Sequence, residues 1–179
     1  MQEALEFTVV PLLKEKGLTL ATAESLTGGT VAQRITNVPG ASSVLGFGYV
    51  TYSAEAKHKL LGVPMQIIDT YGVVSAPVAA RMALGARLNS GADIAVALTG
   101  LAGPDGGTPE TPVGTVYLGG AMGEKVWVLR LSLGNAGRAE VRRQSAETAL
   151  ELVRRLVLGL EVPGAKCFAA DTPAEEEVF

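Results

Sequence analysis

Residues 18–29 read Leu-Thr-Leu-Ala-Thr-Ala-Glu-Ser-Leu-Thr-Gly-Gly and join a short apolar strand to the start of a helix. Leu18 to Ala23 has the length and apolar composition of a buried strand. Glu24-Ser25 follows as a turn, and apolar residues at helical spacing predict a helix from about Thr27 to Thr36. A strand that turns tightly into a helix is a building unit of α/β proteins.

The same alternation of strands and helices continues on both sides of this unit. Pro11 lies inside the first helical pattern, so we expect that helix to kink or to start late. This order of elements predicts a three-layer α/β/α sandwich with a mixed, mainly parallel sheet and a C-terminal hairpin plus helix. The further helices are expected at 3–16, 54–61, 64–71, 75–90 and 139–158, and the further strands at 44–53, 92–99, 113–120 and 125–133.

The length of 179 residues suits one domain, which we expect to span residues 1–160. Residues 161–179 contain Pro163, Gly164, Pro173 and the acidic run Glu175-Glu176-Glu177. Like charges in water cannot bury enough surface to order a chain, so we expect a flexible acidic tail there.

Composition and charge argue against several classes of protein. The net charge is -3 and aromatic residues make up 5%, whereas nucleic-acid binders usually carry a basic stripe or stacking aromatics. No apolar run reaches the roughly 20 residues that span a bilayer, and the N-terminus lacks the basic start of a signal peptide. We therefore expect no nucleic-acid partner and no membrane partner.

The numbers of cysteines and histidines bear on the cellular compartment and on metal binding. Cys167 is the single cysteine, so no internal disulfide can form, and we expect a cytoplasmic protein. One cysteine and one histidine also make a structural zinc site improbable.

Ser25 is the first candidate for chemistry. A serine at the mouth of a helix lies near unpaired backbone N–H groups, which can hold the oxyanion of an acyl transfer. Gly28 and Gly29 would let a substrate approach the backbone closely. The alternative is a plain helix cap, since serine and threonine cap helices routinely.

A serine nucleophile needs a base. His58, the single histidine, lies between Lys57 and Lys59 on a short helix that reads as exposed, so we expect a solvated side chain. Lysine is a known substitute, and either lysine could serve, with Tyr52 nearby. A lysine base near neutral pH needs a pKa of roughly 7 to 8 instead of about 10.4, which requires burial or a neighbouring cation.

Residues 99–108 form a second constellation, a glycine-rich loop that follows a buried strand. Successive glycines can aim N–H groups at a phosphate, although this loop is neither a Walker A loop nor a G-x-G-x-x-G fingerprint. The alternative is a long connection full of turns. A third constellation is the arginine-containing segment 137–144 at the start of the last helix, which could clamp a phosphate or form a solvated helix face.

Several of these segments, in this order, resemble the CinA C-terminal domain family, and the likeness extends from the first helix to about Leu160. The resemblance implies a three-layer α/β/α fold and a nicotinamide-nucleotide amidase of pyridine-nucleotide salvage in NAD metabolism. The segments that carry it are Thr22–Gly29, Gly46–Lys57, Gly72–Ser75, Thr99–Gly107, Pro112–Tyr117 and Val141–Gln144.

The resemblance also assigns roles in the site. The family's serine nucleophile falls on Ser25, its lysine on Lys57 and its assisting tyrosine on Tyr52. One departure is Leu26, where the family often has cysteine, and we expect this side chain to pack without changing the chemistry. We expect the chain to lack the nucleotide-like N-terminal domain of longer family members, so that it resembles the stand-alone form.

The resulting hypothesis is hydrolysis of nicotinamide mononucleotide, a small-molecule nucleotide substrate, to nicotinate mononucleotide and ammonia. It requires no metal or cofactor, and we expect a homo-oligomer. Two alternatives remain: a phosphate-binding nucleotide enzyme, which would need a metal and more carboxylates than Asp105, and a non-catalytic module connected with competence or DNA damage. The expected oxyanion and substrate-binding residues are Thr27, Gly28, Gly29, Gly103, Gly106, Gly107, and Arg142 or Arg143 for the phosphate.

Overall fold

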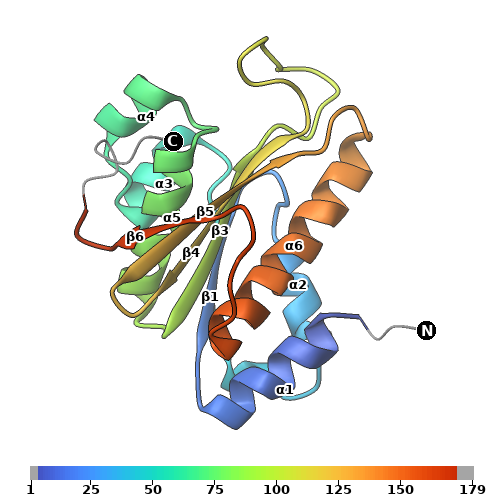
Figure 1. Ribbon diagram of the computed structural model, residues 1–179, viewed down its shortest axis with the longest axis vertical. Coiled ribbons are helices and arrows are strands. Elements are labelled where there is room, and N and C mark those ends of the chain that lie inside the picture. The colour runs from blue at the N-terminus through green and yellow to red at the C-terminus, as the bar shows by residue number, and fades with distance from the viewer. Residues whose placement is uncertain (1–3, 173–179) are drawn as a thin grey trace.

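The computed structural model describes residues 4–172 and places a six-stranded sheet between two layers of helices (Figure 1). The helices are α1 (Glu6–Lys16), α2 (Thr30–Thr36), α3 (Ala54–Leu61), α4 (Met65–Tyr71), α5 (Ala76–Ser90) and α6 (Arg138–Leu158), with a short 3₁₀ turn η1 (Ala41–Ser43). The strands are β1 (Leu20–Glu24), β2 (Leu45–Val50), β3 (Ile94–Gly100), β4 (Thr115–Met122), β5 (Lys125–Ser132) and β6 (Lys166–Ala169).

The sheet is mixed, in the order β2-β1-β3-β4-β5-β6. β1 pairs in parallel with β2 and β3, and the pairs β3–β4, β4–β5 and β5–β6 are antiparallel. Four strands (β1, β2, β3 and β5) therefore run in one direction, although most neighbouring pairs are antiparallel. The three-layer sandwich and the mixed sheet predicted from the sequence are confirmed.

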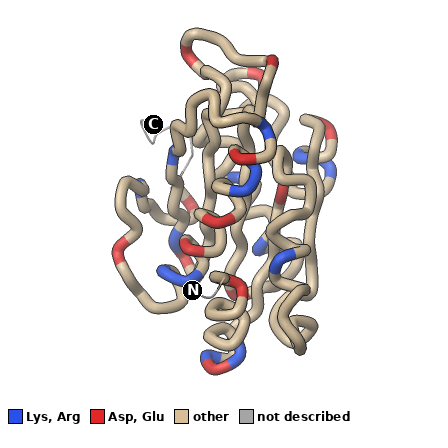
Figure 2. Tube along the Cα trace, turned by 90° about the vertical axis from the view of Figure 1, so that its right-hand side faces the viewer, with Lys and Arg blue, Asp and Glu red and all other residues tan. Residues whose placement is uncertain are grey.

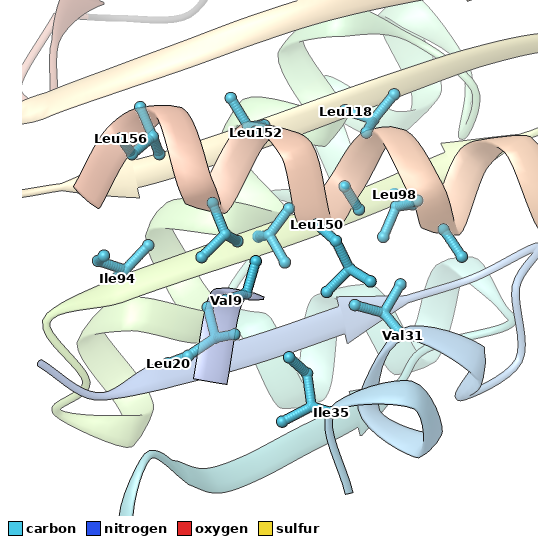
Figure 3. Packing of buried hydrophobic residues seen from close by; sticks show 14 of the residues in the cluster. Val9, Leu20, Val31, Ile35, Ile94, Leu98, Leu118, Leu150, Leu152 and Leu156 are labelled. Atoms are coloured by element: carbon cyan, nitrogen blue, oxygen red, sulfur yellow. The ribbon is translucent and has the colours of Figure 1, made fainter. Parts of the chain in front are cut away.

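Large and small side chains alternate along the central strands, so that the large ones face one helix layer and the small ones face the other. In β3, Ile94, Val96 and Leu98 face one side of the sheet, where α1, α2 and α6 pack. Figure 3 shows this side, with leucines of α6 lying over Ile94, Leu98 and Leu118. Ala95 and Ala97 face the opposite side, which α5 covers. The small side chains let α5 lie close to the sheet.

Close packing continues outward from α5 to α3. A Cβ added at Gly85 of α5 would lie 1.8 Å from the carbonyl oxygen of Leu61, the last residue of α3. Only glycine allows this approach, so Gly85 fixes how α3 sits on α5.

Three sequence expectations need correction. α1 begins at Glu6 and continues through Pro11, so of the two alternatives expected at Pro11, a kink or a late start, the late start is wrong and the kink stays a prediction. α2 begins at Thr30 instead of Thr27, because residues 25–29 form turns. Residues 166–169, expected in a flexible tail, form β6 and pair with the edge of β5. The acidic run 175–177 lies outside the described residues.

Charged residues of both signs are interspersed along the trace (Figure 2). On α6, Arg143 pairs with Glu140, and Arg154 and Arg155 pair with Glu151. Among the helices of residues 4–172, none has the length and apolar character needed to cross a bilayer.

Gly85→Ala should destabilise the protein by about 1–3 kcal/mol, because α3 must move away from α5 to make room for the methyl group. Gly46→Ala is the matched control, since a Cβ there meets no atom within 4 Å. Urea unfolding of both variants measures the difference. Equal stability of the two variants would contradict the close contact.

Candidate active site

The candidate site lies where the chain leaves the carboxyl ends of β1 and β3. In the strand order β2-β1-β3, the chain passes from β1 to β2 on one side of β1 and then from β2 to β3 on the other side. Ligands of α/β proteins bind at such a topological switch point, next to the carboxyl ends of the strands. A cavity of about 220 Å³ opens there. Its lining residues are Ser25, Leu26, Tyr52, Lys57, Val73, Val74, Thr99, Gly100, Leu101, Ala102, Gly103, Asp105 and Arg138.

Ser25 is held by backbone contacts directly after β1. Its N–H donates to the carbonyl of Leu98 at 3.1 Å, and its own carbonyl accepts from the N–H of Gly28 at 3.0 Å. These bonds tie the residue to β3 and close a tight turn over residues 25–28. The side chain is 8% exposed, and its hydroxyl lies 3.1 Å from the amine of Lys57.

Lys57 is the largest of the fully buried side chains, with 1% exposure. Ser53 caps the start of α3 by accepting a hydrogen bond from Ala56, and Lys57 lies one turn into that helix. The amine of Lys57 also donates to the carbonyl of Thr51 at 2.8 Å. Lys57 forms no ion pair with a carboxylate among residues 4–172.

Burial without a carboxylate has a chemical consequence. Desolvation disfavours the ammonium form and lowers the pKa of Lys57 from 10.5 to about 8. This value meets the requirement for a lysine base that works close to neutral pH.

The neighbouring basic residues do not share this environment. The side chain of Lys59 is 68% exposed and pairs with Glu55 at 2.6 Å. His58 is exposed, and its Nδ1 hydrogen bonds to the carbonyl of Val63 at 2.9 Å. Neither residue lines the cavity, so Lys57 is the base that the geometry favours.

Glu24 has a role that sequence reasoning missed. Its fully buried carboxylate accepts hydrogen bonds from the N–H groups of Gly29, Val31 and Ala32, at 3.1, 3.0 and 2.9 Å. This carboxylate, at the end of β1, therefore caps the N-terminus of α2.

The cap changes which amides are free to hold an oxyanion. The N–H of Gly29 is bound to Glu24 and that of Gly28 to Ser25, so these two expected donors are occupied. The amides of Leu26 and Thr27 have no acceptor among residues 4–172. Leu26 also lines the cavity, and its side chain is buried, as expected for a packing residue.

Tyr52 lies at the rim of the cavity, with 61% exposure. Its hydroxyl accepts a hydrogen bond from Arg138 at 2.9 Å, and no hydrogen bond links it to Lys57 in the described chain. Arg138 also donates to the carbonyl of Gly103 at 2.9 Å. The expected assisting tyrosine is thus held at the rim instead of beside the base.

The two arginines expected to bind phosphate lie elsewhere. Arg142 donates to the carbonyls of Leu26 and Thr27, behind the cavity wall, and Arg143 is an exposed partner of Glu140. Arg138, in the same segment, is the arginine that lines the cavity. Of the expected loop glycines, Gly103 lines the cavity, whereas Gly106 and Gly107 are exposed and do not.

Sequence reasoning also missed the apolar wall made by Val73 and Val74. Thr99 holds this wall by donating to the carbonyl of Val73 at 2.6 Å. In the sequence, the family resemblance of the segment Gly72–Ser75 is the one signal that points to this wall.

The family model of the CinA C-terminal domain matches residues 2–157. The chain belongs to the CinA C-terminal domain family. Relatives in this family include a protein of Symbiobacterium thermophilum named as competence-damage inducible, which is 51% identical over 88% of this chain. A CinA-like protein of Geobacter sulfurreducens is 50% identical over 86% of it. The chain spans about two fifths of the length of these curated relatives, 39% and 37%.

Solved structures support the same assignment to the CinA family. The competence/damage inducible protein CihA from Agrobacterium tumefaciens is 41% identical, with a TM-score of 0.83 over 85% of this chain and 93% of that one. A CinA superfamily protein from Klebsiella pneumoniae is 30% identical, with a TM-score of 0.83 over 88% and 99%.

The pKa of Lys57 predicts how stability depends on pH. Between pH 8 and 10.5 the folded protein has released the Lys57 proton while the unfolded chain keeps it, so wild-type stability rises with pH in this window. Lys57→Met removes this dependence. The free energy of unfolding of wild type should therefore rise, relative to that of Lys57→Met, by about 2–3 kcal/mol from pH 7 to pH 10.

Urea unfolding at both pH values measures this difference, and Lys59→Met is the control because that amine is exposed. A constant difference between Lys57→Met and wild type would show that Lys57 titrates as an ordinary lysine.

Proposed function

We propose that this CinA-family protein is an amidohydrolase that converts nicotinamide mononucleotide and water to nicotinate mononucleotide and ammonia. The observation that carries the proposal is the 3.1 Å contact between the Ser25 hydroxyl and the buried amine of Lys57. A desolvated lysine beside a serine at the floor of a cavity is an arrangement for nucleophilic catalysis. The family resemblance supplies the substrate.

The first half of the reaction forms an ester. Neutral Lys57 takes the proton of the Ser25 hydroxyl as the oxygen attacks the carboxamide carbon, which gives a tetrahedral oxyanion. The C–N bond then breaks, and the leaving nitrogen takes the proton from Lys57 and departs as ammonia. The nicotinoyl group stays on Ser25 as an ester.

The second half of the reaction hydrolyses this ester. Lys57 takes a proton from water, which attacks the ester carbon, and the bond to Ser25 breaks. The Ser25 oxygen recovers the proton from Lys57, and nicotinate mononucleotide is released. The carbonyl of Thr51, 2.8 Å from the amine, keeps Lys57 directed at Ser25 through both halves.

The free amides of Leu26 and Thr27 are the proposed oxyanion donors. They follow the nucleophile directly in the chain, and backbone N–H groups in that place stabilise the charge that develops on the former carbonyl oxygen. This assignment keeps Thr27 from the sequence expectation and replaces Gly28 and Gly29, whose amides are occupied.

The cavity offers complementary surfaces for the nucleotide. Val73, Val74 and Leu101 form apolar surface against which a pyridine ring can pack. Arg138, at the rim with its guanidinium on Tyr52 and Gly103, replaces Arg142 and Arg143 as the proposed phosphate ligand. Asp105 is the carboxylate among the lining residues and is the proposed partner of the positive charge of the pyridinium.

Ammonia release from nicotinamide mononucleotide tests the proposal. Ser25→Ala and Lys57→Met should each lower kcat by at least about a thousandfold, because nucleophile and base act as a unit. Lys59→Met should retain wild-type activity, since its exposed amine pairs with Glu55 outside the cavity.

Undiminished ammonia release by Ser25→Ala would exclude the proposed nucleophile. A wild-type protein that releases no ammonia from this nucleotide would exclude the proposed substrate and favour a non-catalytic module.

A further inference from the structure

We propose that Arg142 is a positioning residue that orients the Thr27 N–H, one of the two proposed oxyanion donors, and does not bind substrate. The inference rests on the proposed function, because it concerns the same oxyanion. It assigns a role to a side chain of α6 outside the cavity, whereas the nucleophile lies in the turn after β1 and the base lies on α3.

Arg142 reaches from α6 to the turn that follows the nucleophile. Its Nε donates to the carbonyl of Leu26 at 3.0 Å, and its Nη2 donates to the carbonyl of Thr27 at 3.1 Å. The side chain is partly buried, and no carboxylate pairs with it in the described chain. The planar guanidinium therefore grips two successive carbonyls as a fork.

Peptide geometry turns this grip into an orientation of the amides. In a trans peptide the N–H points opposite to the C=O. Because Arg142 holds the carbonyl of Leu26, the N–H of Thr27 in the same peptide unit is directed away from the guanidinium. Thr27 is fully buried and does not itself line the cavity, and its N–H has no acceptor among residues 4–172, so the proposal assigns the oxyanion to it as acceptor.

Glu24 holds the same segment from its other end. Its carboxylate binds the amides of Gly29, Val31 and Ala32, so the turn of residues 25–29 is fixed between a carboxylate below α2 and a guanidinium on α6. The peptide unit between Leu26 and Thr27 is held neither by Glu24 nor by the Ser25–Gly28 hydrogen bond, and Arg142 restrains its rotation by binding the Leu26 carbonyl.

The test compares Arg142→Gln with Arg143→Gln, an adjacent arginine that is exposed and paired with Glu140. Two readouts are used: kcat and KM for ammonia release from nicotinamide mononucleotide, and the rate at which an alkyl fluorophosphonate modifies Ser25. The reagent forms a tetrahedral phosphorus adduct that needs the same donors. Arg142→Gln should lower both kcat and the modification rate by about 10- to 100-fold, with KM changed less than about threefold. Arg143→Gln should match wild type.

Arg142→Lys separates the fork from the charge. Lysine keeps the charge but cannot hold both carbonyls, so it should restore only part of the modification rate. Circular dichroism melting shows that the compared variants are folded, and Arg142→Lys serves where the glutamine variant does not fold.

Three outcomes would overturn the proposal: an unchanged modification rate in Arg142→Gln, full rescue by lysine, or a tenfold rise in KM at constant kcat, which indicates substrate binding. A wild-type protein that reacts with the fluorophosphonate at Ser25 but releases no ammonia would refute the proposed substrate alone. The Arg142 comparison would then still stand on the modification rate.

Discussion

The burial of one amine beside one hydroxyl governs the arrangement of this site. The amine of Lys57 is almost fully withdrawn from water, has no carboxylate partner in the described chain, and lies 3.1 Å from Ser25. Burial of an ammonium group is unfavourable, so the protein stabilises the neutral, basic form. The helix that carries Lys57, α3, packs closely on α5 at Gly85.

Each layer of the sandwich supplies one part of the proposed machinery. The sheet holds the nucleophile through the bond from Ser25 to Leu98. The layer of α3 and α5 supplies the base. The layer of α2 and α6 fixes the turn after the nucleophile, through the α2 amides bound to Glu24 of β1 and through Arg142 of α6. The groups meet because the carboxyl ends of β1 and β3 lie side by side, as expected at a topological switch point.

The sequence predicted the central fold well because β1 and β3 are short apolar runs and α5 and α6 are long periodic ones. It missed β6, since three of the four residues 166–169 are exposed and their pairing with β5 is a long-range contact. The candidate residue Ser25 followed from local turn chemistry, whereas the burial that distinguishes Lys57 from Lys59 arises only in tertiary structure. For the same reason the sequence located arginines on α6 without showing that Arg138, not Arg142 or Arg143, faces the cavity.

The most direct test of this account is the pKa of Lys57 itself, followed by the ¹³C chemical shift of its Cε in lysine-labelled protein. The Lys57→Met variant identifies the resonance by its disappearance. We expect a midpoint at about pH 8, well below those of the exposed lysines. A midpoint near the ordinary lysine value of about 10.4 would contradict the role of Lys57 as the base.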